Sequence, residues 1–534
     1  MQTKLGTPTV LIVAATMAIG IARAEEDVTA QPCNRAIFAN DRYRFFPDRM
    51  ESFDVYPGVF RSADGRSITK DGDPTYAWHR KWPESLTLAT PYPILDAVFA
   101  LAVDEALSVV APAGTKSAQL DGDKPGGRYY WPYYFYTHGT DVREYTRDTA
   151  QHVQWGDSVL IDPRAAKGSL LRRCDFERQE IREDAVVTAD NVHFIPAAWE
   201  YFKITGDRAV LQQSWDCMWN TMRQKERTHR KGDGLWTGSP WSDAAVGFLR
   251  PEHFANRNNA VKSLYANTVA AGAWRDLAAI ADTLGKPREA ESCRKAFTAL
   301  KDAISRHLYR PEPGTYCYYK YEPTGQCANY SEDISAGMLY LFGVADTSPA
   351  LSYHARFRPT PYGYRNVDPP LPSGEASYHG GNVWENQEVF HGWMLALLQR
   401  PEQLKPFLFW HARAALPLKQ WREGTINPST GLFHSNYKRL VWGAIGYTAY
   451  WTRGVFGIVY EPNGLRFQPC VPNDFGDSFR AVLSHVNYRR SRLSITLLGR
   501  GTKLRQVFLD GKPVKRIPSD LAGQHSIEIR LAGA

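Results

Sequence analysis

The sequence predicts a mainly α-helical chain, in which paired helices form a toroid, followed by a small β-sandwich domain at the C-terminus. Two observations predict the helical part. Amphipathic segments follow one another in pairs from about residue 92 to 458, and tight links within pairs alternate with long loops between them. A third observation predicts the β-domain, because apolar and polar residues alternate near the C-terminus. The length of 534 residues suggests two or three domains.

Residues 1–24 predict a signal peptide. Lys4 precedes an apolar run from about Val10 to Ile21, and the segment ends in the small-residue pattern Ala22-Arg23-Ala24. This run is too short for a membrane span, so we expect an exported protein, periplasmic or extracellular, with no membrane span after signal removal. Residues 25–85 form an irregular region with scattered Pro and Gly. This region could contribute strands or an arm that wraps around the helical domain, and its sequence does not distinguish between the two.

The predicted helical domain covers residues 86–459. Its clearest helix pair is 261–285 with 287–309, where apolar residues recur at steps of three, four and five and Gly285 stands where a C-cap belongs. Similar pairs occur at 188–204 with 207–226, and at 384–399 with 401–415. The long loops between pairs are rich in Gly, Pro, Asn and aromatic residues. We expect these loops to gather at one mouth of the toroid, where binding and catalysis usually take place.

Residues 460–534 predict the β-sandwich. Apolar and polar residues alternate through "SRLSITLLGRGTKLRQVFLDGK", and the Asp-Gly pair at 510–511 predicts a hairpin turn.

Composition excludes several classes of function. The net charge of +8 comes from 64 basic and 56 acidic residues, and the basic residues form only short clusters, so we expect no nucleic-acid partner. Neither a GxSxG elbow nor a phosphate-binding glycine loop is present. The seven cysteines match no zinc spacing, so neither a metal nor an organic cofactor is expected. Cys317 and Cys327 bracket a turn-like loop and predict a disulfide, while the odd count leaves at least one free thiol.

Four motifs in order along the chain resemble one family. They are "YTRDTAQHVQWG" (145–156), "GLWTGSPWSDA" (234–244), "YHGGNVWENQEVF" (378–390), and "WREGTINPSTG" with "LVWGAIGYTAYWTRGVFGI" (421–431 and 440–458). Together they resemble the six-hairpin glycosidases, in particular trehalase, α-L-rhamnosidase and glycogen-debranching-type amylo-α-1,6-glucosidase. The resemblance implies an (α/α)6 barrel closed by a β-sandwich, a carbohydrate substrate and hydrolysis of O-glycosyl bonds. One departure is Glu385, which stands where the family motif usually has Pro after "VW".

Inverting glycosidases need two carboxyl groups about 6.5–9.5 Å apart, one protonated and one ionised. The resemblance places the general acid in the 234–244 loop, where Asp243 follows Trp236 and Trp241, and the general base at Glu423. Indole walls would disfavour the ionised form of Asp243, and solvent with Arg422 or Lys438 would keep Glu423 ionised. Asp243 also fits a helix N-cap. Asp233 remains a competing acid and Glu385 a competing base.

Further residues are candidates for substrate binding. The resemblance implies that Asp148, next to Arg147, accepts hydrogen bonds from sugar hydroxyls, although each also fits a structural ion pair. The other expected pocket-lining residues are Trp236, Trp241, His379, Trp384, Glu385 and Trp442, although Trp442 fits a position in the core equally well.

Three other functions stay open. A related phosphorylase would use phosphate instead of water, but such enzymes lack a catalytic base, so Glu423 favours hydrolysis. A polysaccharide lyase would use Tyr or His to remove a C5 proton from a uronic acid. A catalytically inactive carbohydrate-binding protein would retain binding without turnover.

Overall fold

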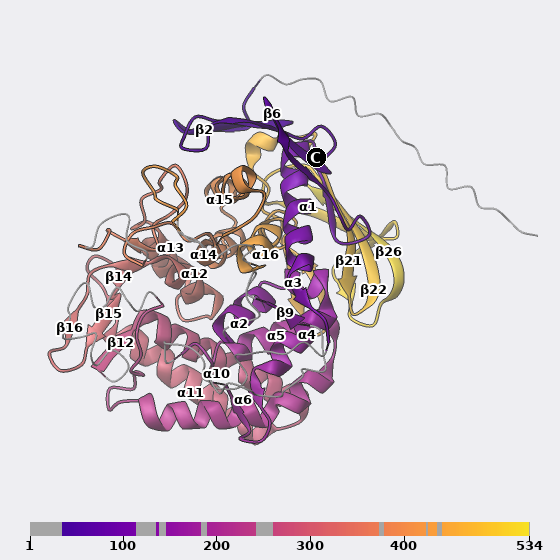
Figure 1. Cartoon of the computed structure of the whole chain (residues 1–534). Coiled ribbons are helices and arrows are strands. Elements are labelled where there is room, and N and C mark those ends of the chain that lie inside the picture. The colour runs from indigo at the N-terminus through magenta and orange to yellow at the C-terminus, as the bar shows by residue number, and fades with distance from the viewer. Residues whose placement is uncertain are drawn as a thin grey trace, which may run out of the picture. The chain divides into compact units, whose positions relative to one another are not determined.

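The structure, a computed structural model, describes residues 35–113, 135–137, 146–182, 189–241, 260–372, 379–422, 426–434 and 441–532. All of them lie within one compact unit, residues 34–534. As predicted, this unit is mainly α-helical, and its C-terminal region is rich in strands (Figure 1).

Six helices contact one another in a closed cycle. They are α2 (Thr146–Gln154), α5 (Phe194–Thr205), α10 (Leu264–Leu284), α12 (Asp333–Leu341), α14 (Glu385–Leu397) and α16 (Val441–Ala449). Each packs on the next in this order, and α16 packs back on α2.

The other main helices of the described part pack outside this cycle. They are α1 (Pro93–Ser108), α4 (Pro163–Arg172), α6 (Arg208–His229), α11 (Pro287–His307), α13 (Thr347–His354) and α15 (Pro401–Ala415), with the short α3 (Asp157–Ile161) before α4. Each contacts the cycle: α1 packs on α16, α4 and α6 on α5, α11 on α10, α13 on α12 and α15 on α14. Helices outside the cycle and helices inside it therefore alternate along the chain. Each predicted helix pair consists of one inner and one outer helix.

Local sequence sets where these helices begin and end. The Ser263 hydroxyl accepts a hydrogen bond from the backbone N–H of Ala266 at 3.1 Å and caps α10. Gly285 ends this helix in the left-handed conformation at φ 77°, as predicted. Where α12 crosses α14, a Cβ on Gly337 would stand 2.1 Å from the backbone carbon of Phe390, so only glycine fits there.

The closing contact of the cycle is polar and buried. The π-helix Tyr450–Val455 follows α16, and its Arg453 side chain donates to the carbonyl of Trp155 after α2 and to Glu200 Oε1 on α5 at 2.6 Å. The Thr452 hydroxyl donates to Asp157 Oδ1 at 2.7 Å. The last helix of the cycle is thus joined to its first two helices.

An antiparallel sheet occupies the region that the sequence leaves irregular. It contains β1 (Phe38–Ala39), β2 (Tyr43–Phe46), β3 (Arg49–Ser52), β4 (Gly58–Arg61), β5 (Ser67–Lys70) and β6 (Asp73–His79), in chain order. Five of these six strands have four residues or fewer, too short for a clear alternating pattern.

The C-terminal region contains two sheets. The larger has the order β24-β23-β26-β22-β21-β7, with β21 (Arg480–Tyr488), β22 (Arg490–Leu498), β23 (Leu504–Leu509), β24 (Lys512–Val514) and β26 (Ala522–Leu531). Its edge strand β7 (Thr87–Ala89) comes from the chain before α1. The smaller sheet joins β19 (Ile458–Glu461), β20 (Gly464–Phe467) and β25 (Ile517–Pro518). Asp510 and Gly511 form the predicted turn between β23 and β24, both at positive φ.

Short elements complete the described part. The strands are β8 (Val110–Ala111), β9 (Phe135–Tyr136), β10 (Cys174–Asp175), β11 (Glu180–Ile181), β12 (Val261–Ser263), β13 (Tyr309–Arg310), β14 (Thr315–Tyr316), β15 (Tyr319–Tyr321), β16 (Gln326–Cys327), β17 (Ser331–Glu332) and β18 (Val367–Asp368). Two 3-10 turns cover Leu416–Leu418 and Asn473–Phe475. The predicted Cys317–Cys327 disulfide is present.

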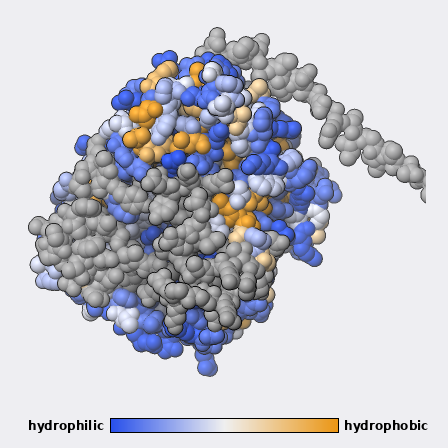
Figure 2. Space-filling model, in the orientation of Figure 1, coloured by the Kyte–Doolittle hydropathy of each residue, from blue (hydrophilic) through white to orange (hydrophobic). Residues whose placement is uncertain are grey.

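The described surface on the visible face is largely hydrophilic (Figure 2). Large apolar side chains exposed in the described part are Phe53, Val55, Trp82, Phe176, Leu432 and Leu504. No helix within the described ranges has both the length and the hydrophobicity needed to cross a bilayer.

Candidate active site

Five of the predicted site residues lie at the N-terminal ends of helices in the closed cycle, namely Arg147, Asp148, Trp384, Glu385 and Trp442. Arg147 and Asp148 stand in the first turn of α2, and Tyr265 stands in the first turn of α10. Trp384 is the N-cap residue of α14, and Trp442 is the second residue of α16. The first turn of a helix leaves backbone N–H groups without helical partners, so these ends carry partial positive charge.

A network of ion pairs and a hydrogen bond joins the N-terminal ends of α2, α5 and α10. The Arg147 guanidinium lies 3.2 Å from Asp190 Oδ2, just before α5, and 3.6 Å from Asp148 Oδ1. The Tyr265 hydroxyl donates to the other Asp190 oxygen at 3.3 Å. Asp148 and Asp190 are both buried. Asp190 therefore fixes Arg147, and the sequence reading missed both Asp190 and Tyr265.

An aromatic group lies next to this network. The Trp241 and Trp384 rings meet edge to face with centroids 4.8 Å apart, and His379 stacks on Trp384 at 5.3 Å. The Arg147 guanidinium lies over the Trp241 ring, 4.6 Å from its centroid. Burial, with the Arg147 charge as a second cause, lowers the pKa of His379 to about 3, so this imidazole is neutral.

Trp236 has different surroundings. Its indole N–H donates to Glu226 Oε2 on the outer helix α6 at 2.7 Å, and its backbone N–H donates to Asn267 at 2.8 Å. Its ring is fully buried. Trp236 anchors the loop before Trp241, and its place in the substrate pocket stays a prediction.

Both proposed catalytic carboxyls, Asp243 and Glu423, lie outside the described residues. Trp241, two positions before Asp243, is 1% exposed, and Trp421, two positions before Glu423, is fully buried. The Trp421 backbone N–H donates to the buried Glu105 carboxylate at 2.9 Å. Both segments are therefore anchored in the interior just before the two carboxyls.

The competing acid Asp233 is poorly suited to donate a proton. Its carboxylate forms an ion pair with Lys262 Nζ at 2.9 Å and accepts the backbone N–H of Leu235 at 3.2 Å. Desolvation opposes ionisation, but these hydrogen bonds outweigh it and lower the pKa of Asp233. Asp233 is therefore ionised at neutral pH.

The competing base Glu385 is poorly suited to accept a proton. Its side chain is 2% exposed, and within the described part neither carboxyl oxygen has a hydrogen-bond partner. Burial raises the pKa of Glu385 to about 8, although its backbone N–H and the Arg413 charge act in the opposite direction. A base must be ionised at the working pH, whereas Glu385 carries a proton at neutral pH.

We expect Glu385→Gln to flatten the pH dependence of stability. Between the ordinary Glu pKa of 4.5 and about pH 8, the folded protein holds a proton here that the unfolded chain has released. The free energy of unfolding therefore falls as pH rises through this window and levels off above it. Chemical denaturation from pH 4.5 to 8.5 measures the slope of the free energy of unfolding against pH.

Asp96 provides the matched comparison, because burial also raises its pKa to about 8. Asp96→Asn should flatten the curve too, and the double variant should flatten it further. An unchanged slope in Glu385→Gln would contradict the assignment.

We expect Asp190→Asn to weaken substrate binding. An amide cannot balance the charge of Arg147, so the guanidinium loses its fixed position over Trp241. KM should rise about tenfold, equivalent to about 1.4 kcal/mol, while kcat changes little. Tyr265→Phe, which removes only the second hydrogen bond to Asp190, should have a smaller effect. Steady-state kinetics on folded variants test this, and an unchanged KM for Asp190→Asn would exclude the positioning role.

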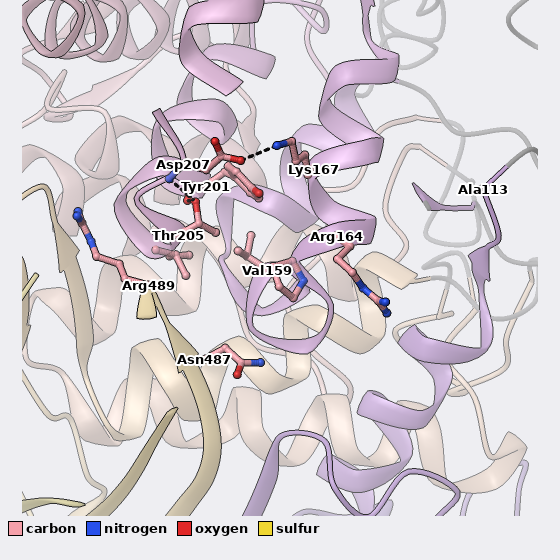
Figure 3. Close-up of a pocket in the computed structure, with 11 residues that line it drawn as sticks. Ala113, Val159, Arg164, Lys167, Tyr201, Thr205, Asp207, Asn487 and Arg489 are labelled. Carbon is pink, nitrogen blue, oxygen red and sulfur yellow. Dashed lines mark hydrogen bonds and ion pairs between the residues drawn. The ribbon is translucent and has the colours of Figure 1, made fainter. Parts of the chain in front are cut away.

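A cavity lies elsewhere, between the helices and the C-terminal sheet (Figure 3). It measures about 500 Å³, and Val159, Lys167, Tyr201, Asp207, Asn487 and Arg489 are among its lining residues. Lys167 and Asp207 form an ion pair at 2.7 Å across one side. None of its lining residues belongs to the network or to the aromatic group.

Known proteins resemble this chain in sequence and in structure. Residues 188–332 match the bacterial alpha-L-rhamnosidase six-hairpin glycosidase domain. No curated protein sequence matches the chain.

Solved structures are similar to this chain, and the first two below share its fold. One is a sialidase, with 13% identity over 80% of this chain and 40% of that chain and a TM-score of 0.61. Another is the GH78 family rhamnosidase of Bacillus sp. GL1, with 13% identity over 87% of this chain and 46% of that chain and a TM-score of 0.54. A GH63 mannosylglycerate hydrolase from Thermus thermophilus matches at 15% identity over 67% of this chain and 100% of that chain, with a TM-score of 0.49. This chain thus spans less than half the length of the first two proteins.

Proposed function

Because the match over residues 188–332 confirms the resemblance to the six-hairpin glycosidases, we propose that this protein is an inverting glycoside hydrolase. The family match is the observation that carries this proposal. The closed cycle of six helices, alternating along the chain with outer helices, supports the further proposal that they form an (α/α)6 toroid.

The proposed mechanism uses Asp243 as general acid and Glu423 as general base. Asp243 protonates the leaving oxygen, while Glu423 removes a proton from the water that attacks the anomeric carbon from the opposite face. The described neighbours support this assignment by exclusion, because Asp233 is ionised and Glu385 is protonated at neutral pH. Arg147 and Asp148 offer a donor and an acceptor to sugar hydroxyls beside the Trp241 ring, which suits the C–H face of a pyranose.

The proposed substrate is a terminal α-linked or deoxy-sugar residue, with an α-L-rhamnoside as the first to test, since the matched domain belongs to bacterial alpha-L-rhamnosidases. We also propose that the protein is exported to the periplasm or the extracellular space. The apolar run between Lys4 and Ala24 supports export, and the Cys317–Cys327 disulfide suits an oxidising compartment.

A screen of aryl-glycosides and oligosaccharides, with product anomers followed by NMR, tests the function. We expect release of a free sugar whose first-formed anomer is inverted, at a rate independent of phosphate. A sugar phosphate formed only with added phosphate would instead indicate a phosphorylase. An unsaturated product that absorbs near-ultraviolet light would indicate a lyase. Binding without turnover would indicate a non-catalytic carbohydrate-binding protein.

A further inference from the structure

Two buried cysteines lie on neighbouring elements, β10 and α6. Cys174 begins β10, and Cys217 lies in α6, and their side chains are 2% and 1% exposed. The two thiols are close enough for Cys217 to raise the pKa of the Cys174 thiol. The Cys217 thiol also donates to the carbonyl of Asp175, the residue after Cys174, with the two atoms 3.8 Å apart.

Hydrogen bonds hold the backbones of these two elements in place. Strands β10 and β11 form a hairpin in which Cys174 pairs with Ile181. The Ile181 N–H donates to the Thr221 hydroxyl at 2.8 Å, and Thr221 lies one helical turn after Cys217 on the same face of α6. Asn220 Nδ2 donates to the Gln179 carbonyl at 3.2 Å. The hairpin is therefore fixed on α6, with the Cys217 thiol beside the strand that begins at Cys174.

We propose that Cys174 and Cys217 form a second structural disulfide in the mature protein, in addition to Cys317–Cys327. In the structure both cysteines are reduced. Formation of the bond removes one hydrogen from each thiol, and the two electrons and two protons pass to a disulfide-type oxidant, which becomes two thiols. One thiolate attacks the oxidant to give a mixed disulfide, and the second thiolate then displaces the oxidant's other sulfur.

The cross-link closes a loop of the chain that contains part of the candidate site. Cys174 and Cys217 are 43 positions apart (217 − 174), and the loop between them includes Asp190 and α5. A loop of this length loses substantial entropy in the unfolded chain when it is closed. The disulfide would therefore stabilise the hairpin on α6 and the segment that holds Asp190 against Arg147.

Burial determines when this bond forms. Desolvation, followed by the neighbouring thiol, raises the pKa of Cys174 well above the usual range, so little thiolate exists in the folded protein. Oxidation should accordingly be fast during folding, while the thiols are exposed, and slow once the protein has folded.

Peptide mapping of the full-length protein tests the proposal without any assay of activity, so its outcome is independent of the proposed function. The protein is refolded in a mixture of oxidised and reduced glutathione, alkylated with iodoacetamide under denaturing, non-reducing conditions, and digested. We expect a linked pair of peptides containing Cys174 and Cys217, with neither alkylated, whereas the buried Cys293 of α11 is fully alkylated. Alkylation of Cys174 and Cys217 as complete as that of Cys293 would overturn the proposal.

Thermal unfolding provides a second readout. In a Cys317→Ser/Cys327→Ser background, reductant should lower Tm by several degrees. Adding Cys217→Ala should abolish this response to reductant, and adding Cys293→Ala should leave it intact. A response that persists in Cys217→Ala would contradict the cross-link. If these variants do not fold, the peptide map of the natural sequence decides the question.

Discussion

Replacing Asp243 by Asn is expected to slow hydrolysis of an unactivated glycosidic bond by about 10²–10⁴-fold, because the leaving oxygen then departs without a proton. The loss should be much smaller for aryl-glycosides with strongly acidic phenols, which leave readily as anions. The measurement is kcat/KM across a series of leaving groups, and a steeper dependence on leaving-group pKa in the variant is the signature of a missing acid.

Asp233→Asn is the matched control for this experiment. Asp233 is the nearby carboxylate of the same loop region, and it is held ionised by Lys262. The control should retain a leaving-group dependence close to that of the unmodified enzyme. Near-normal turnover of Asp243→Asn on the natural substrate would refute the assignment of the acid.

Replacing Glu423 by Gln is expected to reduce turnover by a similar factor of about 10²–10⁴, but equally for good and poor leaving groups. The base acts on water, so its loss does not depend on the aglycone. The acidic limb of the pH–rate profile, which reports ionisation of the base, should also disappear from the residual activity.

Glu385→Gln distinguishes the two candidate bases. Because Glu385 is protonated below about pH 8, its replacement should preserve the acidic limb of the profile, even if substrate binding weakens. The opposite pattern, with the limb lost in Glu385→Gln and kept in Glu423→Gln, would transfer the role of base to Glu385.

Local patterns in the sequence were sufficient to predict much of the secondary structure of the helical domain. The four ends of helices α10 and α11 lie within three residues of their predicted positions, because apolar periodicity and Gly285 act over a few residues. The Asp510-Gly511 turn and the Cys317–Cys327 disulfide are local in the same sense. Such features are readable without knowledge of the rest of the chain.

Features that depend on contacts between distant parts of the chain could not be predicted from the sequence. Asp190 and Tyr265 belong to the site through contacts with Arg147 and with each other, and they are 75 positions apart. Strand β7 pairs with β21, nearly four hundred positions later, so nothing beside it indicates membership of the C-terminal sheet. The short N-terminal strands were missed because each offers too few residues for a period to emerge.

The closing contact between Arg453 and the segment around Trp155 also bears on how the protein is made. These residues are 298 positions apart, so Arg453 must have emerged from the ribosome before the two can meet. Until then, the face of α2 that packs on α16 stays uncovered in the nascent chain. Chains that terminate before α16 should consequently aggregate or recruit chaperones, instead of accumulating as soluble fragments.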